Sequence, residues 1–170
     1  SQVLTNPTFD NSLTGWQDYD SNQVISLNAS DNLEVTKVSS ITKFKTSSAS
    51  SIQTNKEYKV VYKIVESTNV TELKVYTGSS TGYKRIPHQV GVHEVVFKAT
   101  SNYYLLFQVL TPTNGDHVEF EYISLYDYST VPVYVTFKAD KVLGFDQANL
   151  VTGVNVIDDL LMWTDGYTEP

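Results

Sequence analysis

The sequence predicts an all-β protein: an antiparallel β-sandwich followed by the start of a second β-rich segment. Three observations support this class. About eight or nine short runs of alternating apolar and polar residues, separated by turn residues, fill the first 127 residues. No stretch in that region shows a convincing amphipathic helical period. Hydrophobic residues make up 41% and aromatic residues 12% of the 170, which is typical of a globular domain.

The first predicted strands are short. Residues 23–27 and 33–37 alternate around an Asn/Ser/Asp turn. The Ser/Thr-rich stretch 38–54 holds one more strand around Ile41 and Phe44, followed by a polar loop.

The clearest strand covers residues 58–65. Its alternation places one set of side chains on each face of the strand. Lys59 and Lys63 lie on one face, and the opposite, apolar face comprises Tyr58, Val60, Tyr62 and Ile64. This strand is expected to pack its apolar face into the core.

The remaining strands of the sandwich are expected at 72–77, 83–86, 91–99, 103–110 and 118–125. The stretch 103–110 is strongly apolar, so it is expected to lie centrally in its sheet. In the last run the apolar series slips by one position after Tyr122, which predicts a β-bulge near that residue.

Charge and composition exclude several classes of function. Twelve basic against 19 acidic residues give a net charge of -7, which argues against nucleic acid or an anionic membrane as the main partner. The sequence contains no run of about 18 apolar residues, so it predicts no membrane-spanning helix. The chain has no cysteine, so it has no disulfide and no thiolate chemistry.

No catalytic motif was found, and the sequence predicts that the protein is not an enzyme. His88 and His93 are five residues apart, which does not fit the helical zinc pattern. Glu119 and Glu121 share a strand face at about 7 Å, a separation that would suit an inverting glycosidase. A solvated polar face explains this pair better.

The opening segment, residues 6–16, has no regular period. An Asn-Pro turn begins it, Gly15 precedes Trp16, and Phe9 and Trp16 are expected to pin it to the core as a lid. Together with residues 54–62 and 118–126, it resembles the jelly-roll carbohydrate-binding modules of families 4 and 9, whose opening has the form N-x-x-F-E/D-x-x-x-x-G-W. The resemblance covers residues 1–127 and implies a jelly-roll module.

The resemblance implies a structural calcium under the opening segment. The matching acidic positions are Asp10 and Glu121, while the family's second closing Asp is replaced by Tyr122. Calcium takes six to eight oxygen ligands, many of which can be backbone carbonyls. The alternative is that Asp10 caps a turn and Glu121 faces solvent.

The resemblance also implies glycan binding, which needs an aromatic platform beside planar hydrogen-bonding groups. The candidates in the middle of the chain are Tyr76, Tyr83, Arg85, His88 and Gln108. Gln108 is the most suggestive, because it is polar within an apolar strand. The alternative is that the tyrosines are ordinary strand residues and Gln108 faces solvent.

Residues 128–170 differ in character and are predicted to be a connector and a truncated β-rich segment of a following domain. Strands are expected at 133–138 and 142–145. Ile157, Leu160 and Leu161 fit helical spacing, but a hairpin of residues 154–157 and 160–163 around Asp158-Asp159 is favoured. The only methionine is Met162, which suggests that the sequence is an excerpt.

Residues 150–170 resemble a segment of large virion proteins of tailed bacteriophages, notably the crAss-like phages of Bacteroidetes. They also resemble, superficially, the Y-W-T-D blades of β-propellers. The first resemblance implies a non-enzymatic virion protein, in the tail or associated with the capsid. Its module would be structural and would bind host-surface glycan, or would be structural alone. The implied partners are other virion proteins, a homo-oligomer in the particle and a host polysaccharide. The alternative is a carbohydrate-binding appendage of a secreted bacterial glycoside hydrolase, secreted or held at the cell surface.

Overall fold

The computed structural model describes residues 2–79, 81–129, 153–157 and 160–164, and it confirms the all-β class. The chain divides into two compact units, Ser1–Val131 and Pro132–Pro170. The described residues contain no helix, and therefore no helix long and apolar enough to cross a membrane.

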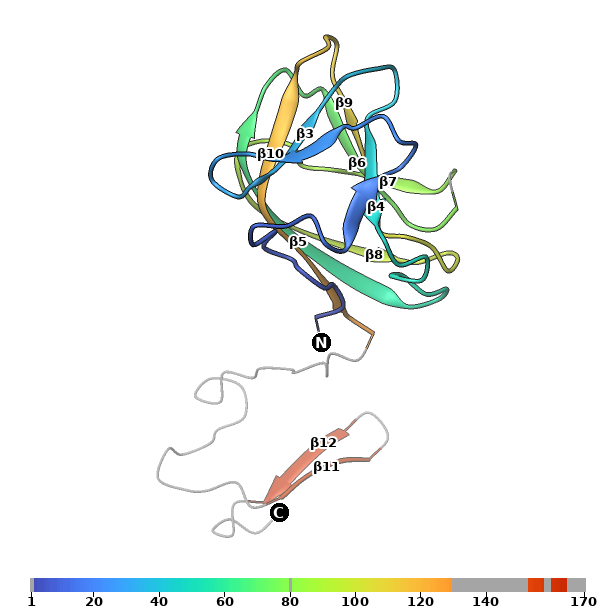
Figure 1. Cartoon of the computed structure of the whole chain (residues 1–170). Helices are drawn as coiled ribbons and strands as arrows, with labels where there is room; N and C mark the ends of the chain where they lie inside the picture. Colours follow the sequence, from blue (N-terminus) through green and yellow to red (C-terminus); the bar gives the residue numbers. More distant parts are fainter. Residues whose placement is uncertain (1, 80, 130–152, 158–159, 165–170) are drawn as a thin grey trace. The chain divides into compact units, whose positions relative to one another are not determined.

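The first unit is a sandwich of two five-stranded antiparallel sheets (Figure 1). The first sheet has the spatial order β1 (Trp16–Asp18), β4 (Lys43–Thr46), β9 (Leu106–Leu110), β6 (Glu72–Tyr76) and β7 (Tyr83–Ile86). The second has the order β2 (Ile25–Leu27), β3 (Leu33–Thr36), β10 (His117–Asp127), β5 (Glu57–Ser67) and β8 (Gly91–Lys98).

Aromatic side chains from both sheets form the centre of the core. Phe44 and Phe107 stack at 5.1 Å between ring centroids on the first sheet, and Phe120 of the second sheet lies 5.8 Å from Phe44. Tyr62 lies 6.1 Å from Phe120, and its hydroxyl donates a hydrogen bond to the carbonyl of Pro87 at 2.7 Å. That bond satisfies the one polar group of this buried ring.

The predicted inner face of residues 58–64 is confirmed, because its four apolar side chains are at most 2% exposed. The central position of the 103–110 strand is also confirmed, since β9 is the third of five strands. The strand itself begins only at Leu106, and Tyr103 instead forms an isolated bridge with Ile52. The predicted bulge is confirmed by register shifts in the β5–β10 pairing around Phe120, just before Tyr122.

The opening segment packs into the sandwich. Phe9 is fully buried, Trp16 is 5% exposed, and their rings lie 5.6 Å apart, so both serve as the predicted anchors. Gly15 adopts a φ of 90°, a conformation that favours glycine. The strand that begins at Trp16 was not predicted, because three residues are too few to show a period.

The start of the chain is held along the last strand of the sandwich. The amide of Val3 donates to the carbonyl of Leu125 at 2.7 Å, and the amide of Ile123 donates to the carbonyl of Pro7 at 2.9 Å. Figure 1 shows this dark-blue segment beside the orange end of β10. The segment therefore belongs to the folded unit.

The described part of the second unit is a two-stranded antiparallel hairpin, β11 (Gly153–Ile157) and β12 (Leu160–Thr164). The register pairs Ile157 with Leu160, so the hairpin prediction is confirmed and the helical alternative is wrong. The predicted strands 133–138 and 142–145 lie outside the described residues.

Candidate ligand-binding face

The outer surface of the first sheet carries polar and aromatic side chains. Alternation along β4 turns Phe44 into the core and leaves Lys43 and Lys45 half-buried on the outside. The same rule leaves Gln108 of β9 and Lys74 of β6 on the outer surface, between buried neighbours.

Four of these outward side chains form a row across neighbouring strands. The register places Lys43 opposite Gln108 and Gln108 opposite Lys74. Lys74 in turn lies opposite Arg85 of β7. Three strand spacings give the row a length of roughly 15 Å. Tyr19 extends it past β4, because the Tyr19 amide donates to the carbonyl of Lys43 at 3.1 Å.

The four residues predicted as a glycan site come together here. The Tyr76 hydroxyl donates to Oε1 of Gln108 at 2.8 Å, and the rings of Tyr76 and Tyr83 lie 6.0 Å apart. Arg85 has its guanidinium carbon 5.8 Å from the centroid of the Tyr83 ring. His88 is half-buried in the loop after β7, and no hydrogen bond or ion pair among the described residues joins it to these four side chains.

Burial separates the roles of the two tyrosines. Tyr83 is 43% exposed, so its ring is available to a ligand, whereas Tyr76 is 4% exposed. Tyr76 therefore orients the Gln108 amide and does not itself offer a platform. Its bond occupies the amide oxygen and leaves the amide nitrogen of Gln108 without a hydrogen-bond partner within the described ranges.

Sequence reasoning missed the lysines of this surface, which lie over tyrosine rings. Lys43 Nζ lies 5.2 Å from the ring centroid of Tyr19 and 5.0 Å from that of Tyr76. Lys45 Nζ is 3.9 Å from Tyr104, and Lys74 Nζ is 4.4 Å from Tyr83. Cation–π contacts of this kind hold an ammonium group in place. The alternation of Lys43–Thr46 was the signal that would have found the first two. We call the surface the tyrosine–lysine face; it comprises Tyr19, Lys43, Lys45, Lys74, Tyr76, Tyr83, Arg85, Tyr104 and Gln108.

Among the described residues, Glu72 is the carboxylate that forms ion pairs with the cations of this face. Glu72 accepts from Lys74 at 3.1 Å and also pairs with Arg85. Burial alone would raise the Glu72 pKa, but the hydrogen bonds from Arg85 and Lys74 outweigh it and lower that pKa. Beside the face, burial and a hydrogen bond with Tyr19 raise the pKa of Tyr103 to about 12. Glu72 is therefore ionised and Tyr103 neutral at physiological pH.

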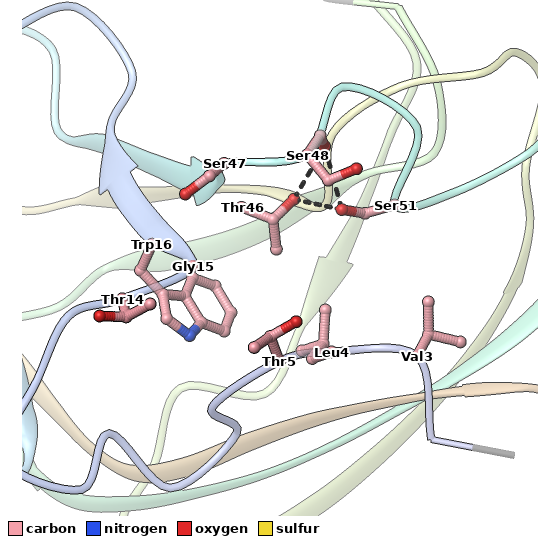
Figure 2. Close-up of a pocket in the computed structure, with 10 residues that line it drawn as sticks. All are labelled: Val3, Leu4, Thr5, Thr14, Gly15, Trp16, Thr46, Ser47, Ser48 and Ser51. Atoms are coloured by element: carbon pink, nitrogen blue, oxygen red, sulfur yellow. Dashed lines mark hydrogen bonds between the residues drawn. The ribbon is translucent and has the colours of Figure 1, made fainter.

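Two cavities adjoin the first sheet. A depression of about 450 Å³ at the β1 edge continues the face, since Tyr19 and Lys45 line it together with Gln17 and Asp18. A second pocket of about 400 Å³ lies between the N-terminal segment and the serine-rich loop after β4 (Figure 2).

The polar groups of this second pocket bond mainly to one another. The hydroxyls of Thr46 and Ser51 lie 2.7 Å apart, and the Ser51 hydroxyl donates to the carbonyl of Ser48 at 3.0 Å, as Figure 2 shows. The Trp16 indole donates to the carbonyl of Asn6 at 3.1 Å. No charged side chain lines this pocket, so the tyrosine–lysine face is the stronger candidate site.

The two predicted calcium ligands lie elsewhere. Asp10 is exposed in the opening segment, and Glu121 forms an ion pair with Lys63 at 2.5 Å. An ammonium group at that distance opposes a cation, so Glu121 fits a calcium site poorly. The calcium stays a prediction, and a fall in melting temperature on adding EDTA would support it. Within the described residues, the side chains grouped closely enough to hold a metal are Glu66, His117 and Glu119.

No protein-family model matches the sequence, and no curated protein matches it. Among solved structures, the CBM22-1–GH10 modules of endo-1,4-β-D-xylanase 10B from Clostridium thermocellum, in complex with xylohexaose, match with a TM-score of 0.52 at 15% identity. That match covers 74% of this chain and 28% of the xylanase chain. A family 29 carbohydrate-binding module from Piromyces equi matches at 12% identity and a TM-score of 0.44, covering 72% of this chain and 86% of that one. The xylanase match shows that the sandwich has a carbohydrate-binding-module-like fold, as the opening resemblance implied, and this chain spans about a quarter of the xylanase structure that it matches.

Proposed function

We propose that residues 1–127 form a non-catalytic module that binds polysaccharide on the tyrosine–lysine face. One observation carries the proposal: the exposed ring of Tyr83 lies on one surface with the planar side chains of Arg85 and Gln108. Sugar rings pack their C–H faces on aromatic rings, while amide and guanidinium groups bond to their hydroxyls. The carbohydrate-binding-module-like fold supports the proposal.

The state of the paired carboxylates favours binding over hydrolysis. Glu119 accepts a hydrogen bond from the amide of Asn28 at 2.7 Å, and Glu121 is paired with Lys63. A general acid must be free to face a substrate, whereas both of these carboxylates are held by side chains of the protein. The pair therefore stabilises the surface of the second sheet.

Affinity gel electrophoresis against a panel of bacterial and plant polysaccharides tests the proposal. Tyr83→Ala and Gln108→Ala are each expected to weaken retardation by at least about tenfold, because a stacking or hydrogen-bonding contact is lost. Tyr126→Ala is the matched control: Tyr126 is 36% exposed but lies on β10 of the other sheet. If no polysaccharide retards the protein, polysaccharide binding is refuted in favour of the competing hypothesis of a structural contact between neighbouring chains.

We further propose that the module belongs to a bacteriophage virion protein, where it meets host-surface glycan and assembles as a homo-oligomer with other virion proteins. The support is the resemblance of residues 150–170 to virion proteins of crAss-like phages. Mass spectrometry of purified particles from a host culture tests this setting. A full-length reading frame flanked by genes for catabolic enzymes would contradict it.

The second candidate is a binding appendage of a secreted glycoside hydrolase. The xylanase that shares this fold favours it, since its structure holds a carbohydrate-binding module and a GH10 module together. In that case the full-length reading frame would encode a catalytic domain beside residues 1–170. Sequencing that reading frame separates the two settings.

A further inference from the structure

The tyrosine–lysine face is rich in positive charge, whereas the whole chain carries a net negative charge. The face holds Lys43, Lys45, Lys74 and Arg85, a third of the twelve basic residues, whereas the chain carries a net charge of -7. Their one carboxylate partner is Glu72, which takes both Lys74 and Arg85. Opposite charges are thus segregated, with cations concentrated where a ligand would bind.

Two of these cations lack a neutralising partner. Lys43 and Lys45 are half-buried, and neither forms an ion pair with any carboxylate of the described ranges. Each instead lies over tyrosine rings, with Lys45 Nζ 3.9 Å from the ring centroid of Tyr104. A partly desolvated ammonium group that is fixed in place is a ready partner for an anion.

The cations are also arranged along a line. Lys43, Lys74 and Arg85 share the row that crosses β4, β9, β6 and β7, with Gln108 between the first two. Lys45 lies two residues from Lys43 on β4, and it lines the depression at the β1 edge together with Asp18. An extended chain lying across the strands would therefore meet positive charge at both ends and an exposed ring at Tyr83.

We infer that the polysaccharide bound on this face is anionic, bearing carboxylate or sulfate groups that pair with Lys43 and Lys45. The inference rests on the proposed function and names its ligand class. Single-stranded nucleic acid also combines aromatic stacking with phosphate contacts. Its one charge per nucleotide would meet the strong negative charge of the rest of the chain. A polysaccharide with sparser charges matches two free ammonium groups better.

Isothermal titration of the full chain with matched polymer pairs tests the inference. Each pair shares a backbone and differs in charge: carboxymethyl cellulose against hydroxyethyl cellulose, and dextran with fewer than one sulfate per sugar against unmodified dextran. At low salt the charged member is expected to bind about tenfold more tightly, and added salt should remove that advantage. The two pairs together show whether carboxylate or sulfate is preferred.

The lysine variants make the test specific to this face. Lys43→Gln and Lys45→Gln should each weaken binding of the charged polymer about threefold, and together about tenfold, so that the affinity ratio between the charged and the neutral member falls toward one. Lys59→Gln is the control, because Lys59 pairs with Glu94 on the second sheet. Unchanged melting temperatures show that the variants fold.

The possible results separate the inference of an anionic ligand from the proposal that the face binds polysaccharide. Equal affinity for the two members of each pair, with the lysine variants unaffected, overturns the anionic ligand and leaves polysaccharide binding intact. No binding to any polymer overturns the proposed function itself. Tighter binding of a single-stranded oligonucleotide than of every polysaccharide overturns both.

Discussion

Replacing Trp16 by alanine tests whether the opening segment is part of the cooperative core or a lid that opens separately. The indole is 5% exposed, and its ring lies 5.6 Å from Phe9 and 5.9 Å from Phe44. It also donates a hydrogen bond to the carbonyl of Asn6 at 3.1 Å. Truncation of a buried tryptophan lowers the free energy of unfolding by about 3–5 kcal/mol.

The structure places Trp16→Ala at the lower end of that range. Trp16 lines the pocket of about 400 Å³ between the N-terminal segment and the loop after β4, as Figure 2 shows. Water can enter the enlarged space, which reduces the penalty for an empty cavity. We expect a loss of about 3 kcal/mol, which moves the urea midpoint by about 1.5 M for a slope near 2 kcal/mol per M. Trp16→Phe, which keeps a ring and loses the indole N–H, should lose about 1–2 kcal/mol.

Tryptophan fluorescence can follow the opening segment, because the chain has few tryptophans. The chain has two tryptophans, Trp16 and Trp163, so Trp163→Phe leaves fluorescence that reports on the opening segment alone. In that background, urea unfolding followed by Trp16 fluorescence and by far-UV circular dichroism should give coincident transitions. A fluorescence change that is complete at lower urea, or a Trp16→Ala variant with an unchanged midpoint, would refute the reasoning.

Two further predictions concern the interior. Tyr62→Phe removes the hydrogen bond to the carbonyl of Pro87, so it should lower the free energy of unfolding by about 1–2 kcal/mol at neutral pH. Burial raises the pKa of Tyr62 in the folded state above the unfolded value of about 10. This stability is complete below that value and is lost as pH rises toward the folded pKa, so urea titrations at about pH 8 and 11 should show a smaller difference from wild type at the higher pH. Gly78→Ala would place its Cβ against the hydroxyl of Thr100, costing about 1–3 kcal/mol. Thr100→Ala should relieve part of that loss in a double-mutant cycle of melting temperatures, whereas strict additivity would show that the two side chains do not clash.

Periodicity predicted the strands whose faces differ most in burial. The alternation of residues 58–64 was readable because its apolar face is almost completely buried while Lys59 and Lys63 remain outside. The bulge before Tyr122 was readable for the related reason that a shift in pairing must break the alternation. These features are local, so a single sequence contains them.

Strand pairing is a long-range property, and it determined what the sequence could not show about the site. Lys43 and Gln108 are neighbours because β4 pairs with β9, although 65 residues separate them in the chain. No local sequence pattern predicts the pairing of β4 with β9, so sequence analysis did not assign the lysines to the site. Burial also changed the role of Tyr76, from an expected platform to a support for the Gln108 amide.

The division of the sandwich into a core and an outer face makes folding and binding separable by mutation. Phe44 and Phe107 hold the first sheet against the second, whereas Tyr83 lies on the outer face and is 43% exposed. Substitutions at exposed positions usually change stability by less than about 0.5 kcal/mol. A loss of binding in Tyr83→Ala can therefore be assigned to a lost ligand contact. The same loss in a Tyr76 variant could not, because that ring is 4% exposed and its removal would disturb both the sheet and Gln108.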